Sequence, residues 1–305
     1  MVLPWFTLLL ASLTWVLGEW PGERTLPTLL LAYAPPLLWV GATLPALLWT
    51  HGHGKGRRVA WAALLVATWG AGALHLRPQA EGALRVVTFN VLGGQRATPI
   101  QLGRALAALN ADVILLQESR FATPEGRALL TAALPGYRAE HAAEVTTLTR
   151  LPLLDVQVWP LPANRREVLL TRLSWQGRPL GVVNAHLGTV QVSSVLTGDL
   201  ERVRRTRDAR DQQVRLLRDI AAQSPGLLLL GGDLNTPPRG RTYRELRTAF
   251  GPDAHDQAGR GPGWTFPPLL LRIDHVMGRG LTPRSARVLP WALSDHRPLL
   301  VTFDR

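Results

Sequence analysis

The sequence predicts an α/β protein whose globular domain follows an apolar N-terminal segment. Residues 1–76 carry only two acidic and four basic residues, and they hold seven of the eleven tryptophans. From residue 85 onward, apolar runs of strand length alternate with segments of helical periodicity, which is the pattern of α/β domains. We therefore divide the chain into an N-terminal anchor (1–76), a linker (77–84) and a globular domain (85–305).

Three stretches of the N-terminal segment lack Asp, Glu, Lys and Arg, and we interpret each as a transmembrane helix. They are Val2–Leu17, Leu26–Thr50 and Val59–Leu76. A bilayer core of about 30 Å needs roughly 20 apolar residues in a helix. The second stretch is long enough, and the other two lie near the lower limit. No basic region precedes the first stretch, which argues against a cleaved signal peptide. A buried helical bundle in a soluble protein is the remaining alternative.

The charges between these stretches predict an orientation. The loop at 51–58 carries three fixed positive charges, whereas the loop at 19–24 is net acidic. Basic loops stay in the cytoplasm, so three spans would place everything after Arg77 outside it. We therefore expect a multi-pass cell-membrane protein with an extracytoplasmic globular domain. The absence of cysteine suits that location and excludes disulfides and thiolate catalysis.

The globular domain opens with a predicted strand, Arg85–Phe89. Thr98 and Pro99 then have the residue types of a helix N-cap and first helical position, and leucines recur on one face of the following helix. Later apolar runs have the length of buried strands. They are Val113–Leu116, Leu180–Val183, Leu227–Leu230, Arg272–Val276 and Leu299–Phe303.

Polar side chains recur at the ends of these runs. A carboxylate placed directly after four aliphatic residues is poorly placed for a solvated surface charge, but well placed for a cleft lined by strand ends. A turn or cap would explain one such residue. It does not explain the whole set, which we interpret as a site. Its members are Asn90, Glu118, Asn184, His186, Asp233, Asn235, Asp274, Asp295 and His296.

These segments resemble, in order, the motifs of the endonuclease/exonuclease/phosphatase (DNase I-like) superfamily. The resemblance implies a four-layer sandwich of two packed mixed β-sheets flanked by helices. Bacterial members with three N-terminal spans, including proteins linked to teicoplanin resistance, resemble this chain throughout. The matching segments are Thr88–Asn90, Leu116–Glu118, Asn184–Leu187, Gly231–Asn235, Gly263–Thr265, Arg272–Asp274 and Ser294–His296.

The resemblance also implies a divalent metal, Mg²⁺ with Mn²⁺ as an alternative, held by oxygen ligands. Glu118 matches the metal-binding glutamate of the superfamily, and Asn90 matches the amide beside it. Asp233 and Asn235 match the pair that orients the attacking water and the phosphate. We therefore expect a metal-dependent phosphoric ester hydrolase.

The histidines complete the implied site. His296 matches the imidazole that holds the scissile phosphate or transfers a proton, and Asp274 matches the carboxylate that orients it. Asp295 would be a metal or water ligand. His186 and Asn184 match phosphate contacts near the leaving group. A non-catalytic binding protein is the less consistent hypothesis, because the full set is present.

The substrate is predicted less directly. A membrane anchor favours a lipid-linked phosphate, whereas the formal net charge of +12 favours DNA or RNA as an alternative substrate. The segment Arg202–Arg218 is a predicted helix with its arginines facing solvent. The apolar segment at 190–196 could meet lipid chains or pack in the core.

Overall fold

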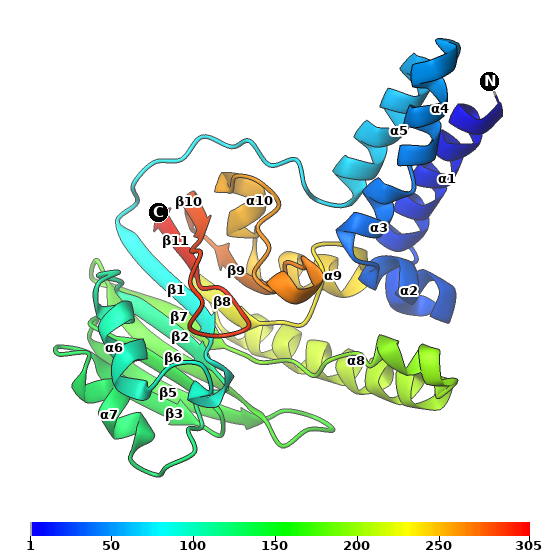
Figure 1. Cartoon of the computed structure of the whole chain (residues 1–305). Helices are drawn as coiled ribbons and strands as arrows, with labels where there is room; N and C mark the ends of the chain where they lie inside the picture. Colours follow the sequence, from blue (N-terminus) through cyan, green and yellow to red (C-terminus); the bar gives the residue numbers. More distant parts are fainter. Residues whose placement is uncertain (1) are drawn as a thin grey trace.

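The computed structural model describes residues 2–305, apart from the side chain of Leu37, and it has the predicted α/β fold (Figure 1). The strands are β1 Leu84–Asn90, β2 Val113–Gln117, β3 Arg138–Ala142, β4 Val145–Thr149, β5 Leu153–Pro160, β6 Glu167–Trp175, β7 Arg178–Asn184, β8 Leu227–Asp233, β9 Asp274–Arg279, β10 Thr282–Val288 and β11 Leu299–Asp304. The α-helices are α1 Val2–Glu19, α2 Leu26–Tyr33, α3 Pro36–Gly41, α4 Leu44–His53, α5 Arg57–Gly70, α6 Pro99–Ala107, α7 Gly126–Ala132, α8 Leu200–Gln223, α9 Gly240–Phe250 and α10 Ala254–Ala258. Short 3₁₀ helices are η1 Gly22–Arg24, η2 Leu92–Gly94, η3 Val192–Thr197 and η4 Pro267–Leu269.

The strands form two mixed sheets. One has the order β10-β11-β1-β2-β4-β3, and the other has the order β5-β6-β7-β8-β9. Strands β1 and β2 run parallel, as do β7 and β8. The carboxyl ends of all four therefore point to the same end of the sandwich, where β9 and β11 begin.

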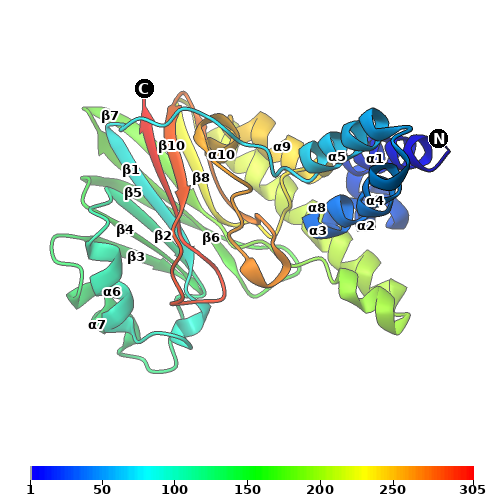
Figure 2. The same ribbon diagram turned by 45° about the horizontal axis from the view of Figure 1, so that its top comes forward.

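Three apolar cores produce the four expected layers. The faces that meet between the sheets contribute residues such as Val86, Leu115, Val182 and Leu229. Helices α6 and α7 cover the outer face of the first sheet, and α8 and α9 cover the outer face of the second (Figure 2). The run Leu227–Leu230 is apolar on both sides because β8 faces a core on each side.

The N-terminal segment corrects the prediction of three transmembrane helices. Only α1 is by itself long and apolar enough to cross a membrane among the described residues. The stretch Leu26–Thr50 reaches that length only as a pair of helical segments bent by 96°. Pro35 and Pro36 explain the break, because proline removes a backbone donor and disfavours a helical residue before it. Pro45 lies in the first turn of α4, where proline is tolerated. The third stretch forms only α5, of 14 residues, which ends at Gly70.

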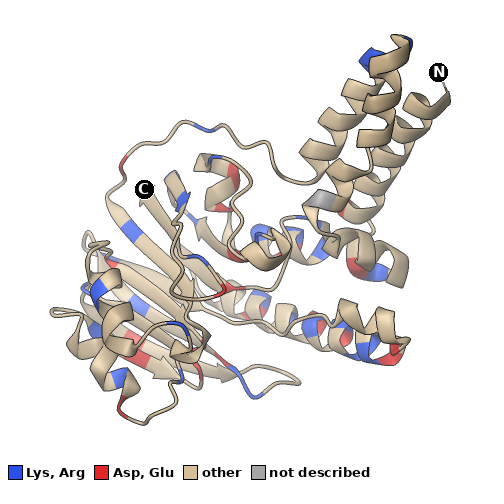
Figure 3. Ribbon diagram, viewed as in Figure 1, with Lys and Arg blue, Asp and Glu red and all other residues tan. Residues whose placement is uncertain are grey.

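The helices and the globular domain are docked onto each other rather than joined by a free tether. Glu23 accepts hydrogen bonds from the backbone nitrogens of Arg241 (2.8 Å) and Thr242 (3.3 Å), and so caps the N-terminus of α9. The N-cap residue of α9, Arg239, makes no side-chain hydrogen bond to the helix N-terminus. Glu19 pairs with Arg244 at 3.2 Å. In Figure 3, acidic residues lie at the end of the helical bundle (α1–α5) next to the globular domain, and basic residues lie at its opposite end.

The linker and the segment at 190–196 are also packed. The backbone nitrogen of Ala80 donates to Arg284, and the Gln79 side chain donates to Ala258 and Ala286. Val190 is buried against α2, together with η3 residues, whereas Leu196 is 91% exposed. The core-packed interpretation of this segment is therefore correct for most of it.

Candidate active site

The site lies where the two sheets converge at their shared end. Asn90 ends β1 opposite Gln117, and Asp233 ends β8 opposite Asp274, the first residue of β9. Parallel strands place the residues that follow them at one edge of a sheet. The packing of the two sheets then brings both edges together around Asp233.

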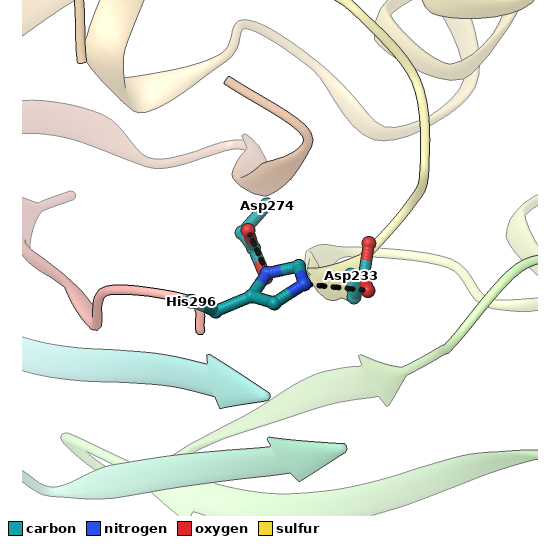
Figure 4. Close-up of side chains that lie close together, drawn as sticks. All are labelled: Asp233, Asp274 and His296. Atoms are coloured by element: carbon teal, nitrogen blue, oxygen red, sulfur yellow. Dashed lines mark hydrogen bonds and ion pairs between the residues drawn. The ribbon is translucent and has the colours of Figure 1, made fainter. Parts of the chain in front are cut away.

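A chain of three buried groups forms the centre (Figure 4). The imidazole Nδ1 of His296 lies 2.8 Å from Asp274 Oδ2, and its Nε2 lies 3.7 Å from Asp233 Oδ2. Each of the three residues is at most 5% exposed. The predicted orientation of His296 by Asp274 is therefore present in the structure.

His296 and Asp233 each favour the charged form of the other. Burial alone would lower the pKa of His296, but the nearby carboxylates of Asp274 and Asp233 raise it to about 10. Burial alone would raise the pKa of Asp233, but the two histidines, His296 and His186, lower it. At neutral pH the centre therefore presents a protonated imidazole beside a carboxylate.

His186 belongs to a second pair on the other side of Asp233. Its Nδ1 lies 2.8 Å from Glu144 Oε1, and its Nε2 lies 3.3 Å from Asp233 Oδ2. Glu144 also accepts the backbone N–H of Glu118 at 3.2 Å and pairs with Arg166 at 3.3 Å. Each histidine is thus held by its own carboxylate, Glu144 or Asp274, and each directs its Nε2 toward the same oxygen of Asp233.

Glu118 is the carboxylate best suited to a cation. Its Oε1 accepts a hydrogen bond of 3.1 Å from the amide of Asn90, which also donates to Asp233. No basic side chain of the described chain lies within ion-pair distance of it. Hard oxygen donors on a half-buried, unpaired carboxylate fit a divalent cation. The cluster of Asp233, Asp274 and His296 also lies close enough to hold a metal. In this cluster both ring nitrogens of His296 already face the two carboxylates.

Backbone conformation sets the shape of the site. Glu118 and Asn235 have φ angles of 50° and 46°, in the left-handed region that residues other than glycine rarely adopt. Such strain concentrates at functional sites. Gly232 has a φ of 148°, and a Cβ there would lie 1.9 Å from the carbonyl oxygen of Ala185. Glycine is therefore required for β8 to approach the segment that carries His186.

The structure places the remaining predicted residues differently. Asn235 is half-buried, donates from its amide to Leu187 and accepts from Thr189. Asp295 lies at the rim, where it accepts a hydrogen bond from Ser294. Asn184 is fully buried, and its amide nitrogen donates to Thr146. Asn184 links the sheets here, so its expected contact with substrate finds no support in this geometry.

Sequence reasoning missed Glu144 and Gln117. Glu144 lies in the turn between β3 and β4, two strands that the sequence pattern did not reveal. Gln117 stands beside Glu118 in a matched motif, and its buried amide donates to Asn184 across the two sheets at 2.9 Å. A single acidic residue in a hairpin turn carries no local sequence signal, so only the fold could identify Glu144.

The arginines of α8 correct another expectation. Arg210 is 2% exposed and donates to the carbonyls of Gly188 and Leu234, and to Thr236. The prediction that the arginines face solvent is therefore wrong for this residue. Arg210 connects the loops that follow β7 and β8. The backbone carbonyls in these loops have no partner in the sheet and need a hydrogen-bond donor.

A second buried network lies beneath the site. Asp253 pairs with Arg272 at 3.0 Å and with His275 Nδ1 at 2.5 Å, and His275 Nε2 contacts the Thr236 carbonyl at 2.8 Å. Burial alone would raise the pKa of Asp253, but Arg272 and His275 hold it well below its usual value. Arg272 is therefore paired away from Asp274, which is left to orient His296.

Comparison with known proteins agrees with this geometry. The profile of the Endonuclease/Exonuclease/phosphatase family matches residues 87–296. A UPF0294 protein of Yersinia pseudotuberculosis is 30% identical over 258 residues, which cover 74% of this chain and 85% of that protein. A UPF0294 protein of Yersinia enterocolitica is 29% identical over 250 residues, covering 72% and 84%.

Solved structures share the fold at low sequence identity. The TDP2 of D. rerio, in complex with a single-strand DNA product, aligns with a TM-score of 0.56 and 18% identity over 73% of this chain and 99% of that one. A mannosyl-6-phosphatase of Bacteroides thetaiotaomicron aligns with a TM-score of 0.56 and 14% identity, covering 72% and 99%. The catalytic domain of human Nocturnin, with a bound sulfate anion, has a TM-score of 0.53 and 19% identity, covering 75% and 96%.

Proposed function

The chain belongs to the endonuclease/exonuclease/phosphatase family, and we propose that it is a Mg²⁺-dependent phosphoesterase that hydrolyses a lipid-linked phosphate ester. The family comprises phosphoesterases and nucleases, so hydrolysis of a phosphate ester is the class of reaction. The metal, the lipid substrate and the membrane location are the parts that we propose.

The observation that carries the proposal is the arrangement of Asp233 between two histidines that are each held by another carboxylate. Phosphoester hydrolysis needs positive charge on the phosphoryl oxygens, an oriented water and a proton for the leaving oxygen. Protonated His296 supplies a positive N–H, and ionised Asp233 accepts a hydrogen bond from water. His186, held by Glu144, stands on the other side of Asp233 and can donate to a leaving oxygen.

Glu118 and Asn90 are the residues that would hold the cation, with Asp295 at the rim as a further oxygen donor. A bound Mg²⁺ would supply charge neutralisation for the phosphoryl oxygens. The side-chain amide of Asn90 and the backbone N–H of Asn235 both donate to Asp233 and keep its carboxylate in place. Asn90 ends β1 and Glu118 directly follows β2, so the two main candidate ligands are positioned by strand ends.

The lipid-linked substrate is supported by the position of the anchor. Tyr33, at the end of α2, donates a hydrogen bond of 3.3 Å to the carbonyl of Asn235. The apolar helices thus contact the loop that carries a site residue. A lipid-borne phosphate shares the plane of such an anchor and reaches a high effective concentration there.

The proposed location follows from the same arrangement. The turn with Lys55, Arg57 and Arg58 lies at the end of the bundle opposite the globular domain. By the positive-inside rule, this turn is cytoplasmic and the site extracytoplasmic. A reporter that is active only outside the cytoplasm, fused after Arg305, should be active. If instead only a reporter that works in the cytoplasm is active after Arg305, the proposed location is wrong.

The substrate and metal are tested together with the full-length protein in lipid vesicles. We expect hydrolysis of a lipid phosphate that EDTA abolishes and Mg²⁺ restores, and poor cleavage of plasmid DNA. Efficient cleavage of DNA with no action on the lipid would replace this proposal by a membrane-tethered nuclease, which the net charge of +12 favours.

A matched pair of variants tests the metal ligand. Glu118→Gln should lose most Mg²⁺-stimulated hydrolysis, because a neutral amide is a poor ligand for a hard dication. Glu125→Gln makes the same change at an exposed position and should retain full activity. If Glu118→Gln hydrolyses the lipid as fast as wild type while EDTA still inhibits it, Glu118 is not the ligand.

A further inference from the structure

A cavity of about 620 Å³ lies where the helical bundle meets the globular domain, away from the catalytic groups. Bundle residues Trp15 and Trp69 form part of its wall, together with Leu76 from the segment that follows α5. Arg77, Arg239 and other charged residues of the linker and globular domain form the rest. One side of the cavity is therefore apolar and continuous with the exposed bundle, and the other side is polar and basic.

Two buried guanidinium nitrogen atoms in this wall have no hydrogen-bond partner among the described residues. They are Nη1 of Arg239 and Nε of Arg272. Arg239 is 4% exposed and Arg272 is 3% exposed. A buried donor without a partner costs about 1–3 kcal/mol. Two of them beside one cavity point to a ligand that supplies acceptor atoms.

The wall contains two carboxylates, Glu19 and Asp256, which are both paired with arginines, so its unpaired charge is positive. Arg272 and Arg247 are both paired with Asp256, which also lines the cavity. Arg77 and Arg239 have no carboxylate within ion-pair distance in the described chain. Their two positive charges favour an anion, and a phosphate accepts several hydrogen bonds from guanidinium groups.

Arg239 is held in a way that prepares it for such a ligand. Its guanidinium lies 4.7 Å from the ring centre of Trp39, and its Nη2 donates to the carbonyl of Ala34 at 3.3 Å. Both partners belong to the bundle, so the cation stays oriented at the junction. Burial lowers the pKa of Arg239 to about 10, although the charge of Glu19 opposes this. An added anion would offset that cost of burial.

The apolar wall identifies the source of the phosphate. Trp69, at the end of α5, is 64% exposed, and Leu76, in the extended segment that follows α5, is 86% exposed. Tryptophan is typical of the boundary between lipid chains and headgroups. A free phosphate would leave this surface in water, whereas a lipid would cover it. Basic pockets at this depth are suited to anionic headgroups.

We propose that this junction cavity binds the phosphate of an anionic membrane lipid, with Arg77 and Arg239 as its cationic contacts and the Trp15–Trp69 side against the acyl chains. The bound lipid would connect the bundle to the globular domain, separately from the catalytic site. The inference rests on the proposed location of the helices in a bilayer, and not on the proposed reaction.

The test measures thermal unfolding of the full-length protein in mixed micelles, with phosphatidylglycerol or phosphatidylcholine added. A ligand that binds only the folded state raises the Tm. We expect phosphatidylglycerol to raise the Tm by a few degrees and phosphatidylcholine to leave it unchanged. No hydrolysis is measured, so a failure of the proposed reaction would not affect this result.

Three variants locate the binding. Arg77→Gln, at an exposed position, and Arg239→Gln should each reduce the Tm increase by at least half. Arg178→Gln removes an exposed arginine at the start of β7 and should keep it in full. An unchanged increase in Arg77→Gln would overturn the proposal, and would place the lipid elsewhere, including the catalytic site. An equal increase with inorganic phosphate alone would overturn the lipid assignment.

Discussion

The helical bundle and the β-sandwich use apolar residues in opposite directions. In the bundle, Leu9, Leu48 and Trp61 are each more than half exposed. In the sandwich, Val86, Leu229 and their neighbours are fully buried between the sheets. An exposed apolar surface of this kind marks a contact with lipid or protein. Both regions are rich in apolar residues, so composition does not distinguish them. Only the packing shows that the apolar side chains of the bundle remain exposed.

Their polar residues differ in the same way. The acids of the bundle, Glu19 and Glu23, lie at its end and bind the globular domain. The acids of the site, Glu118, Asp233 and Asp274, instead lie at strand ends of the sandwich, and each is held by a histidine or an amide. Buried charge is costly unless paired, so these partners account for the persistence of the site. Four predictions can break or sharpen this comparison.

The largest effect is expected from removing a group at the centre of the buried chain. His296→Gln should lower phosphoesterase activity by about 10²- to 10⁴-fold, the usual contribution of a positioned acid or base. His51→Gln changes a histidine on the exposed α4 helix and should leave activity unchanged. Kinetics on the same substrate measure both. A loss of less than tenfold in His296→Gln would remove this residue from the chemistry.

The second prediction compares the two apolar surfaces directly. Leu229→Ala leaves a void between the sheets and should cost about 2–5 kcal/mol of unfolding free energy. Leu48→Ala, in a side chain that is 74% exposed, should cost less than about 0.5 kcal/mol. Denaturant unfolding in detergent measures both changes. Equal costs would mean that the bundle surface is buried in the protein as it exists in solution.

The third prediction concerns pH, and its sign follows from His296. The folded pKa of about 10 exceeds the ordinary value of 6.5. The protonated imidazole therefore contributes stability that is fully present below pH 6.5 and is lost as the pH rises to about 10. The pKa values of His141 and His255 are lowered instead, mainly by burial, so they titrate below this window.

Unfolding measured between pH 6 and pH 10 tests this expectation. Wild type should lose stability across that range, and Asp274→Asn should lose less, because the carboxylate nearest His296 is gone. Each unit by which the pKa of His296 falls corresponds to a tenfold change in its protonation equilibrium. Parallel pH profiles for the two proteins would contradict the assigned pairing.

The smallest effect is expected at the contact between the two regions. Glu23 is 6% exposed and caps α9 from outside that helix. Glu23→Gln keeps an acceptor oxygen but loses the charge, so it should cost about 0.3–1 kcal/mol. Glu81→Gln, on a linker side chain that is 73% exposed, is the matched control. Thermal unfolding compares them, and equal Tm values would mean that the bundle docks without this cap.

The sequence by itself determined the fold class, the central strands and most of the site, for a physical reason. Buried strands such as Leu227–Leu230 are continuous apolar runs, and a polar residue directly after one has few places to go except a strand-end cleft. The capping box at Thr98 and Gln101 likewise needs only local contacts, and the helix α6 begins where expected. Resemblance then placed Glu118, Asp233, Asp274 and His296 in one site, and the structure brings them together.

Only the tertiary structure decided what depends on distant contacts. Glu144 reaches His186 through a hairpin of strands with weak patterns, Arg210 is buried because loop carbonyls need a donor, and Asn184 is sealed between the sheets. The prolines of the second apolar stretch bend it, so its length did not translate into a span. Glu23, finally, became the cap of a helix more than two hundred residues away, because the pairing of a carboxylate with backbone N–H groups is set by packing and leaves no local trace in the sequence.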